Sequence, residues 1–187
     1  MTTTREPDYT VRPARPEDAD GIDALDTSFS TGTVFEVAAS GIGFTLREVP
    51  VDPPLVKVFP DDDDDDDGDD SGGPYDRTLV AIAPGGELAG YVTVSHAPWN
   101  RRLTIEDIGI APAHRRRGIG RLLVERAADL ARSYGAAHLW LEVTNVNAPA
   151  IHAYLRLGFT FCGLDTTLYD GTASAGEQAL FMSRPCT

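Results

Sequence analysis

Hydrophobic positions along the chain repeat with two different periods, and this predicts strands that alternate with helices. Residues 9–12 have the pattern of a short strand. Beyond Pro16 the chain has an acidic start, and Ile22, Leu25 and Phe29 then recur at helical spacing. We therefore expect one strand followed by one helix in this part of the chain.

The middle of the chain has the period of strands. Apolar residues between positions 33 and 58 predict strands that are interrupted by a glycine turn at 41–43. Two further apolar runs, 78–83 and 88–95, are separated by Pro-Gly-Gly at 84–86. This spacing predicts a β-hairpin.

A strand, a turn and an amphipathic helix follow. The strand is expected over residues 103–110, and the helix begins at Ile119 and is closed by Gly135. Its expected buried stripe consists of Leu122, Leu123, Ala127 and Leu130. Residues 138–143 predict the next strand, with alternate side chains on one buried face. This order predicts a parallel crossover unit with an anionic ligand near the ends of the central strands.

The turn between that strand and its helix carries most of the candidate chemistry. We call residues 115–121 the Arg-Gly turn; it consists of Arg115, Arg116, Arg117, Gly118, Ile119, Gly120 and Arg121. Glycine lacks a Cβ atom, which permits unusual dihedrals and close approach to a ligand. Free amides at a helix start favour anions, and guanidinium groups bind phosphate oxygens in pairs. The pattern indicates a phosphate site, although a basic surface turn would have the same composition.

Two common nucleotide motifs do not match this turn. A Walker loop needs Gly-Lys followed by Ser or Thr, and a Rossmann turn needs a third glycine and a later acidic residue. The pattern Arg-x-x-Gly-x-Gly instead resembles the acetyl-CoA pyrophosphate loop of the GCN5-related N-acetyltransferase (GNAT) superfamily. A second segment resembles the other half of that site through Asn147, Ala150, Tyr154, Gly158 and Phe159. Two matches in this order are more specific than either alone.

The resemblance implies a fold and an acetyl donor. The expected fold class is α/β (α+β): a central mixed, mostly antiparallel sheet flanked by helices, with a parallel pair of central strands splayed at the acetyl-CoA site. We expect residues 1–187 to form a single GNAT domain. The implied acetyl-CoA site comprises Ile108, Gly109, Ile110, Arg115, Arg116, Arg117, Gly118, Ile119, Gly120, Arg121, Asn147 and Tyr154. No metal is expected.

The implied reaction is direct acetyl transfer to an amine in a ternary complex. By resemblance, backbone amides near Ile108 and Ile110 hold the donor and polarise its carbonyl, and the Tyr154 phenol protonates the departing thiolate. An amine must lose a proton before it attacks. By resemblance, Glu106, Asp107 or the neighbouring Glu142 is the base, acting through ordered water, or no dedicated base is used; any of these acids could instead bind the cationic acceptor. Strand alternation places the adjacent pair Glu106 and Asp107 on opposite faces. Tyr154 could instead be a packing residue, and His152 is interpreted as a surface or capping histidine.

A wider resemblance is carried by residues 43–55, 99–104, 139–154 and 162–178 and by the acidic loop. These segments resemble the streptothricin-acetylating members of the superfamily, which modify the β-lysine amine of a cationic antibiotic. For the acceptor we expect Asp52, Trp99 and Glu142 to contribute to binding, because carboxylates and aromatic faces attract ammonium groups. Tyr91 is better explained as a core residue. Other acceptors remain open: a polyamine, an aminoglycoside or a protein lysine. A non-catalytic acyl-CoA sensor is a further alternative.

Charge along the chain is concentrated in one place. Nine of the ten residues 61–70 are aspartates, and they supply most of the net charge of −13. Such a run repels itself, so we expect a disordered surface loop over 61–73. It is interpreted as a solvated tether, with an electrostatic collector for a polycationic substrate as the alternative. A calcium loop fits less well, because the regular ligand spacing and the closing glutamate are absent. So acidic a chain is not expected to bind nucleic acid.

The remaining sequence features predict a soluble cytoplasmic protein. The 187 residues, of which 42% are hydrophobic, suit a domain with a sizeable core. No segment has the length and hydrophobicity of a signal or a membrane span, so no membrane partner is expected. Cys162 and Cys186 lack the spacing of a metal site or a disulfide framework. A homodimer is expected only because dimers are common among such enzymes.

Overall fold

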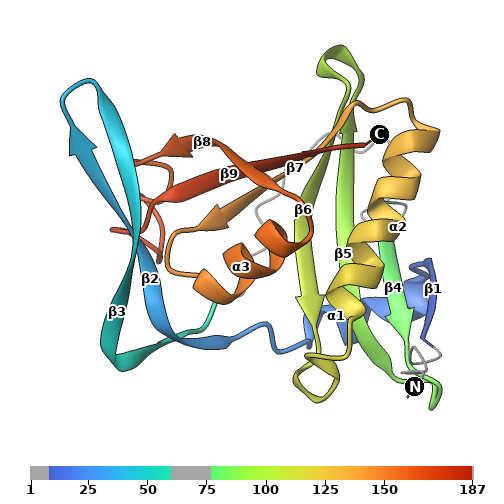
Figure 1. Ribbon diagram of the computed structural model, residues 1–187. Helices are drawn as coiled ribbons and strands as arrows, with labels where there is room; N and C mark the ends of the chain where they lie inside the picture. The colour runs from blue at the N-terminus through green and yellow to red at the C-terminus, as the bar shows by residue number, and fades with distance from the viewer. Residues whose placement is uncertain (1–8, 60–76, 187) are drawn as a thin grey trace, which may run out of the picture. The chain divides into compact units, whose positions relative to one another are not determined.

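The computed structural model describes residues 9–59 and 77–186, which form two compact units (Figure 1). Of the described residues, the first unit contains 9–27, 77–139 and 186, and the second contains 28–59 and 140–185. The acidic run and the loop expected over 61–73 lie outside the described residues.

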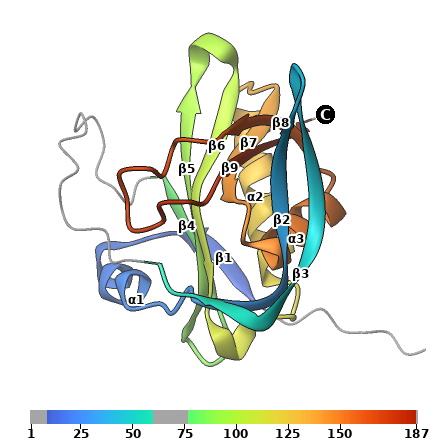
Figure 2. The same ribbon diagram turned by 90° about the vertical axis from the view of Figure 1, so that its left-hand side faces the viewer.

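An antiparallel sheet forms the first unit. Its strands are β1 (Thr10–Pro13), β4 (Thr78–Ile82), β5 (Leu88–Ala97) and β6 (Arg102–Ile110), and they neighbour one another in that order. The hairpin expected from the Pro-Gly-Gly turn is thus confirmed as β4 and β5. The helices α1 (Ala19–Asp23) and α2 (Ile119–Ser133) lie on opposite sides of these strands (Figure 2).

The first helix is shorter than the sequence pattern predicts. After a single 3₁₀ turn, α1 ends at Asp23, and Phe29 begins the strand β2 (Phe29–Ser40) rather than continuing the helix. Its inclusion in a helical stripe was wrong. The Ser- and Thr-rich stretch after position 26 favours extended backbone, and Phe29 pairs with Lys57 across the hairpin, which overrides the helical spacing.

Small residues let α2 pack closely on the sheet. The helix buries Ile119, Leu123, Val124, Ala127, Ala128 and Ala131, whereas Leu122 and Leu130 are only half-buried. The buried stripe is therefore rotated from the expected one towards the alanines. Gly135 adopts a φ of 68° just after the helix, as a closing glycine requires.

The second unit combines a long hairpin with a second group of strands. The hairpin consists of β2 and β3 (Gly43–Lys57), joined at the expected glycine turn. The strands β7 (His138–Thr144), β9 (Ala179–Pro185) and β8 (Thr160–Asp165) neighbour one another in that order, and α3 (Ala148–Arg156) packs against β2. The first two residues of β7 belong to the first unit.

The end of β7 is fixed to the hairpin by one buried amide. The Asn145 side chain donates to the Phe35 carbonyl at 2.7 Å and accepts from the Gln178 amide at 2.8 Å. Its backbone also bonds both partners, each at 2.9 Å. Since a buried polar group is costly unless its hydrogen bonds are made, this network specifies where β7 ends and α3 begins.

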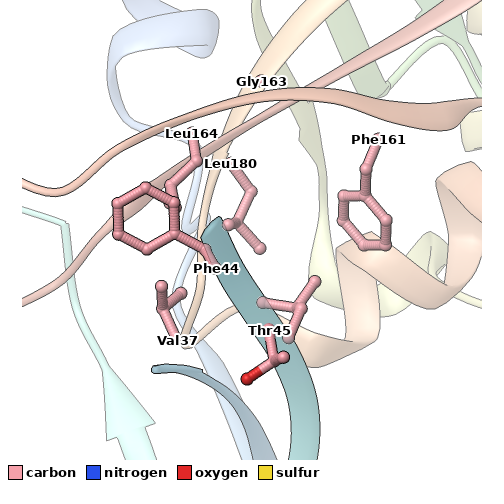
Figure 3. Close-up of a pocket in the computed structure, with 8 residues that line it drawn as sticks. Val37, Phe44, Thr45, Phe161, Gly163, Leu164 and Leu180 are labelled. Atoms are coloured by element: carbon pink, nitrogen blue, oxygen red, sulfur yellow. The ribbon is translucent and has the colours of Figure 1, made fainter. Parts of the chain in front are cut away.

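An apolar pocket lies between the hairpin and the strands β8 and β9 (Figure 3). It has a volume of about 140 Å³ and is lined by Val37, Phe44, Thr45, Leu46, Phe161, Gly163, Leu164 and Leu180. None of the sequence-predicted site residues lines it. The candidate chemistry lies elsewhere in the molecule.

Candidate active site

The Arg-Gly turn has the backbone conformation that its glycines predict. After β6, a 3₁₀ turn at Pro112–His114 leads into it, and Gly118 caps the start of α2 with a φ of 83°. Arg116 also has a positive φ of 61°, which is unusual for a residue with a side chain. The chain therefore bends sharply just before the helix.

Backbone donors are available where the helix begins. The first intrahelical bond runs from the Leu122 amide to the Gly118 carbonyl at 3.0 Å, so the amides of residues 119–121 have no helical acceptor. A Cβ added at Gly118 or Gly120 would have no atom within 4 Å. Free amides beside open space at a positive helix end fit the pyrophosphate of a coenzyme.

The four arginines of the turn are not equivalent. Arg115 donates to the Ile110 carbonyl at 3.0 Å and to the Asp26 carbonyl at 2.7 Å, so its guanidinium ties the turn to the end of β6 and to the segment after α1. Arg116, Arg117 and Arg121 are exposed. The structure thus gives Arg115 a bracing position and leaves the other three as cations at the surface.

A β-bulge changes the expected geometry of Glu106 and Asp107. Thr93 pairs with Asp107 and Val94 with Ile105, so Glu106 is an extra residue in β6. The Ser95 hydroxyl donates to Glu106 and the Tyr91 phenol donates to Asp107. Tyr91 and Ser95 share one face of β5.

The expectation that these carboxylates lie on opposite faces was wrong. The bulge interrupts the strand alternation, and both carboxylates then reach hydroxyl groups on the same face of β5. The other Asp107 oxygen accepts from the Ile108 amide at 2.7 Å. An amide that the resemblance assigns to the acetyl donor is therefore bound here to a neighbouring carboxylate.

Tyr91 is a core residue, as the sequence favoured. It is only 6% exposed, and its ring lies against Gly109, the residue opposite it on β6. The Tyr91 phenol then reaches Asp107. A side chain at position 109 would collide with this ring.

The second expected half of the site lies in the second unit. Asn147 caps α3 by accepting from the Ala150 amide at 3.2 Å, which confirms the predicted cap. Tyr154 is half-buried on α3, with its ring centroid 5.7 Å from that of Phe159. His152 bonds Glu48 at 3.1 Å and is partly exposed, in agreement with a surface histidine.

Glu142 belongs to a polar group that sequence reasoning did not find. We call Glu142, Thr144, Tyr169, Glu177 and Lys57 the Glu142 cluster. The Tyr169 phenol donates to Glu142, while Lys57 and Thr144 each donate to Glu177 at 2.5 Å. These residues come from β7, β3 and the segment between β8 and β9.

The surroundings of Glu142 raise the pKa of its carboxyl group. The Glu142 side chain is exposed, but neighbouring groups partly desolvate its carboxylate, which raises the pKa of Glu142 above its ordinary value. The hydrogen bond from Tyr169 opposes this rise, and the charge of Glu177 adds to it. Burial and the adjacent Glu142 also raise the pKa of Tyr169. The phenol therefore stays protonated and remains a donor to Glu142.

Two expected acceptor-binding residues are not members of this cluster. Asp52 is exposed on β3, in the second unit. Trp99 is 87% exposed in the 3₁₀ turn after β5, in the first unit. Within its own unit, and among the described residues, neither has a hydrogen bond or ion pair to another named site residue.

Lys57, Tyr169 and Glu177 are the residues that the sequence analysis missed. Lys57 and Glu177 are 120 positions apart, and Tyr169 lies 27 positions beyond Glu142. No local spacing marks such a set, because it exists only once β3, β7 and the segment before β9 have folded together. Within residues 9–59 and 77–186, no group of three or more metal-binding side chains is found, nor a helix long and apolar enough to cross a membrane.

The chain is similar to known acetyltransferases along its whole length. It is 63% identical over 188 residues to the streptothricin acetyltransferase of Streptomyces lavendulae, and the match covers all of both chains. Its fold is similar to the crystal structure of a nourseothricin acetyltransferase, with a TM-score of 0.86 and 63% identity over 96% of this chain and 99% of the other.

A more distant structure shows the same fold. It is a Bacillus anthracis chain solved in complex with acetyl coenzyme A, 20% identical, with a TM-score of 0.76 over 95% of this chain and 98% of the other. The Acetyltransferase (GNAT) family matches residues 45–159. The fold class expected from the sequence is thereby confirmed, and this chain belongs to the Acetyltransferase (GNAT) family.

Proposed function

We propose that this protein is an acetyl-CoA-dependent N-acetyltransferase that inactivates streptothricin-class antibiotics by acetylating an amine of their β-lysine moiety. The observation that carries the proposal is the 63% identity to the Streptomyces lavendulae streptothricin acetyltransferase, because it extends over the full length of both chains. A match restricted to the cofactor segments would support the acetyltransferase class and leave the acceptor open.

The Arg-Gly turn is the proposed site for the pyrophosphate. The amides of residues 119–121 would donate to it, Gly118 and Gly120 keep the approach open, and Arg116, Arg117 and Arg121 add positive charge. Arg115 supports the site by holding the turn against Ile110 and Asp26. The backbone of residues 108–110 and the Asn147 segment complete the proposed cofactor contacts.

Acetyl-CoA supplies the acetyl group as a thioester, and the protein supplies the proton transfers. A carboxylate must take a proton from the acceptor ammonium, with Glu106, Asp107 and Glu142 as candidates. Backbone amides near Ile108 and Ile110 are proposed to stabilise the negative charge that develops on the carbonyl oxygen; the Ile108 amide would have to give up its bond to Asp107 to do so. The Tyr154 phenol then protonates the departing thiolate. The transfer is proposed to be direct, with both substrates bound.

The cationic acceptor is proposed to bind through carboxylates and one aromatic face. Asp52 and Glu142 carry the charge, and the exposed ring of Trp99 offers a cation–π contact. Streptothricin-class molecules carry several amines, so they match an acidic protein surface better than a neutral acceptor would. This chemistry is shared with other polyamines, which must therefore be tested beside the antibiotic.

A product assay tests the proposal. Purified protein is mixed with acetyl-CoA and with streptothricin, a lysine peptide, an aminoglycoside or spermidine, and CoA release and product mass are followed. We expect rapid addition of one acetyl group to streptothricin, and kcat/KM at least tenfold lower for the other amines. Tight binding of acetyl-CoA without transfer to streptothricin would overturn the substrate assignment.

A further inference from the structure

The two carboxylates of the Glu142 cluster differ in what holds them. Glu177 is committed on both oxygens: Oε1 accepts from the Lys57 ammonium and Oε2 accepts from the Thr144 hydroxyl, each at 2.5 Å. Glu142 accepts from the neutral Tyr169 phenol, and it has no ion pair within the part of the chain that the structure describes. Of the two carboxylates, Glu142 is the one that can pair with a cation from outside.

The position of Glu142 in the fold also favours a role at the reacting amine. Leu141 and Val143 are 1% and 6% exposed, so strand alternation directs Glu142 to the opposite face of β7. The same strand leads through Asn145 into α3, which carries Tyr154. One short strand–helix segment of the second unit thus carries both a carboxylate and the proposed acid.

The carboxylates of β6 are less available. Both oxygens of Asp107 are bonded, one to the Tyr91 phenol and the other to the Ile108 amide, and Glu106 accepts from the Ser95 hydroxyl. A base needs a lone pair that points to its substrate. Asp107 is therefore better suited to bracing β6 than to taking a proton.

We propose that Glu142 is the proton acceptor for the amine and that Tyr169 is its positioning residue, holding the carboxylate through the phenol hydrogen bond. This inference rests on the proposed acetyl transfer and names its base. Glu142 takes one proton from the ammonium, which frees the nitrogen lone pair. The nitrogen then bonds to the carbonyl carbon, and the carbon–sulfur bond breaks. Tyr154 gives its phenol proton to the departing thiolate, and the second proton lost by the nitrogen replaces it. Glu142 afterwards returns its proton to water.

The Glu142 cluster shifts the pKa of Glu142 in two opposing directions. Partial desolvation and the Glu177 charge favour the protonated form, whereas the Tyr169 hydrogen bond favours the charged form. Lys57 limits the first effect because it pairs with Glu177. The charged and titratable groups around Glu142 are thus Tyr169 and Glu177 from the segment before β9 and, through Glu177, Lys57 from β3.

Two variants should move the acid limb of the pH profile in opposite directions. In Tyr169→Phe the lost hydrogen bond raises the pKa of Glu142, so the limb of kcat/KM for the acceptor moves up by roughly one pH unit. Activity below the limb falls about tenfold and recovers at high pH. In Glu177→Gln the lost negative charge lowers that pKa, so the limb moves down. Glu142→Gln should remove the limb and most of the activity.

A tyrosine of the first unit provides the matched control. Tyr134 is 50% exposed and stacks on His96, so Tyr134→Phe should leave the profile unchanged. Thermal unfolding of each variant reports folding. If Glu177→Gln unfolds, the comparison of Tyr169→Phe with Tyr134→Phe still tests whether Tyr169 positions Glu142. A uniform loss of activity in Tyr169→Phe, without a shift of the limb, would overturn the positioning role.

The titration of Glu142 itself separates this inference from the substrate proposal. With ¹³C-labelled glutamate, the resonance that disappears in Glu142→Gln can be followed against pH without any substrate. We expect a midpoint above the ordinary value of a glutamate, and a higher one in Tyr169→Phe. Streptothricin turnover with an unshifted midpoint would overturn the base assignment alone. If the midpoint and the limb shift as expected but the protein acetylates another amine, only the substrate proposal is overturned.

Discussion

The Arg-Gly turn and the Glu142 cluster differ in the groups that form them: backbone amides in the turn and side chains in the cluster. The turn is seven consecutive residues whose ligand groups are backbone amides, set by a helix start and two glycines. The cluster is a set of side chains from three separate segments, held by hydrogen bonds to two carboxylates. The first should be sensitive to added atoms and tolerant of lost side chains, whereas the second should be sensitive to the loss of single polar atoms.

The largest effect is expected where a side chain is added to the turn. Gly120→Asp places a negative charge in the open space beside the free amides. A like charge about 4 Å from a phosphate costs about 4 kcal/mol at an effective dielectric constant of 20, which corresponds to roughly a 1,000-fold loss of acetyl-CoA affinity. Isothermal calorimetry measures this loss directly.

Gly32→Asp is the matched control for that variant. Gly32 also has no atom within 4 Å of an added Cβ, but it lies in β2. Its affinity for acetyl-CoA should stay within a factor of two or so of the parent. Equal affinities for Gly120→Asp and the parent protein would refute the assignment of the turn to the pyrophosphate.

The next effect concerns a single oxygen on α3. Tyr154→Phe removes the phenol and keeps the ring that contacts Phe159. Loss of a general acid typically costs at least about 100-fold, so kcat should fall by roughly that factor while acetyl-CoA affinity changes little. Rapid-quench measurement of the chemical step checks this. An unchanged chemical step would reduce Tyr154 to a packing residue.

Asn145 tests, through stability rather than catalysis, whether the loss of a few polar atoms has a large effect. Asn145→Ala leaves the Phe35 carbonyl and the Gln178 amide without their buried partner, which should cost about 2–3 kcal/mol. The corresponding fall in Tm is roughly 5–10 °C. Differential scanning calorimetry provides the comparison.

Asn100 provides the contrasting asparagine. Within the described residues, its buried Oδ1 has no hydrogen-bond partner, so Asn100→Ala removes an unsatisfied acceptor. Its effect on Tm should be much smaller than that of Asn145→Ala. Equal losses in the two variants would show that the hydrogen bonds of Asn145 are not what stabilises the end of β7.

The smallest effects separate the arginines of the turn. Arg115→Ala loses two bonds to backbone carbonyls and should lower Tm by roughly 2–4 °C. Arg117→Ala removes only an exposed charge, so it should weaken acetyl-CoA binding severalfold and leave Tm unchanged. If both variants affect only affinity, Arg115 binds the coenzyme and does not brace the turn.

These differences also explain what could be predicted from the sequence. The Arg-Gly turn, the Asn147 cap and the closing Gly135 depend on neighbours along the chain, so their spacing was sufficient. The Glu106 bulge and the early end of α1 depend on strand pairing and were mispredicted. Lys57, Tyr169 and Glu177 become neighbours of the β7 carboxylate only through folding, and no local pattern could have identified them.

Gly109 limits which sequences this chain can reach by mutation. A Cβ at this position would lie 2.6 Å from the Tyr91 ring and 3.2 Å from Leu25. Any larger residue at 109 must therefore follow a smaller one at 91, and that first change removes the phenol bonded to Asp107. A library that varies position 109 alone should return glycine, whereas one that varies both positions should recover coupled pairs. Changes at the β6 carboxylate Asp107 are thus coupled, through the Tyr91 ring, to the absence of a side chain at position 109.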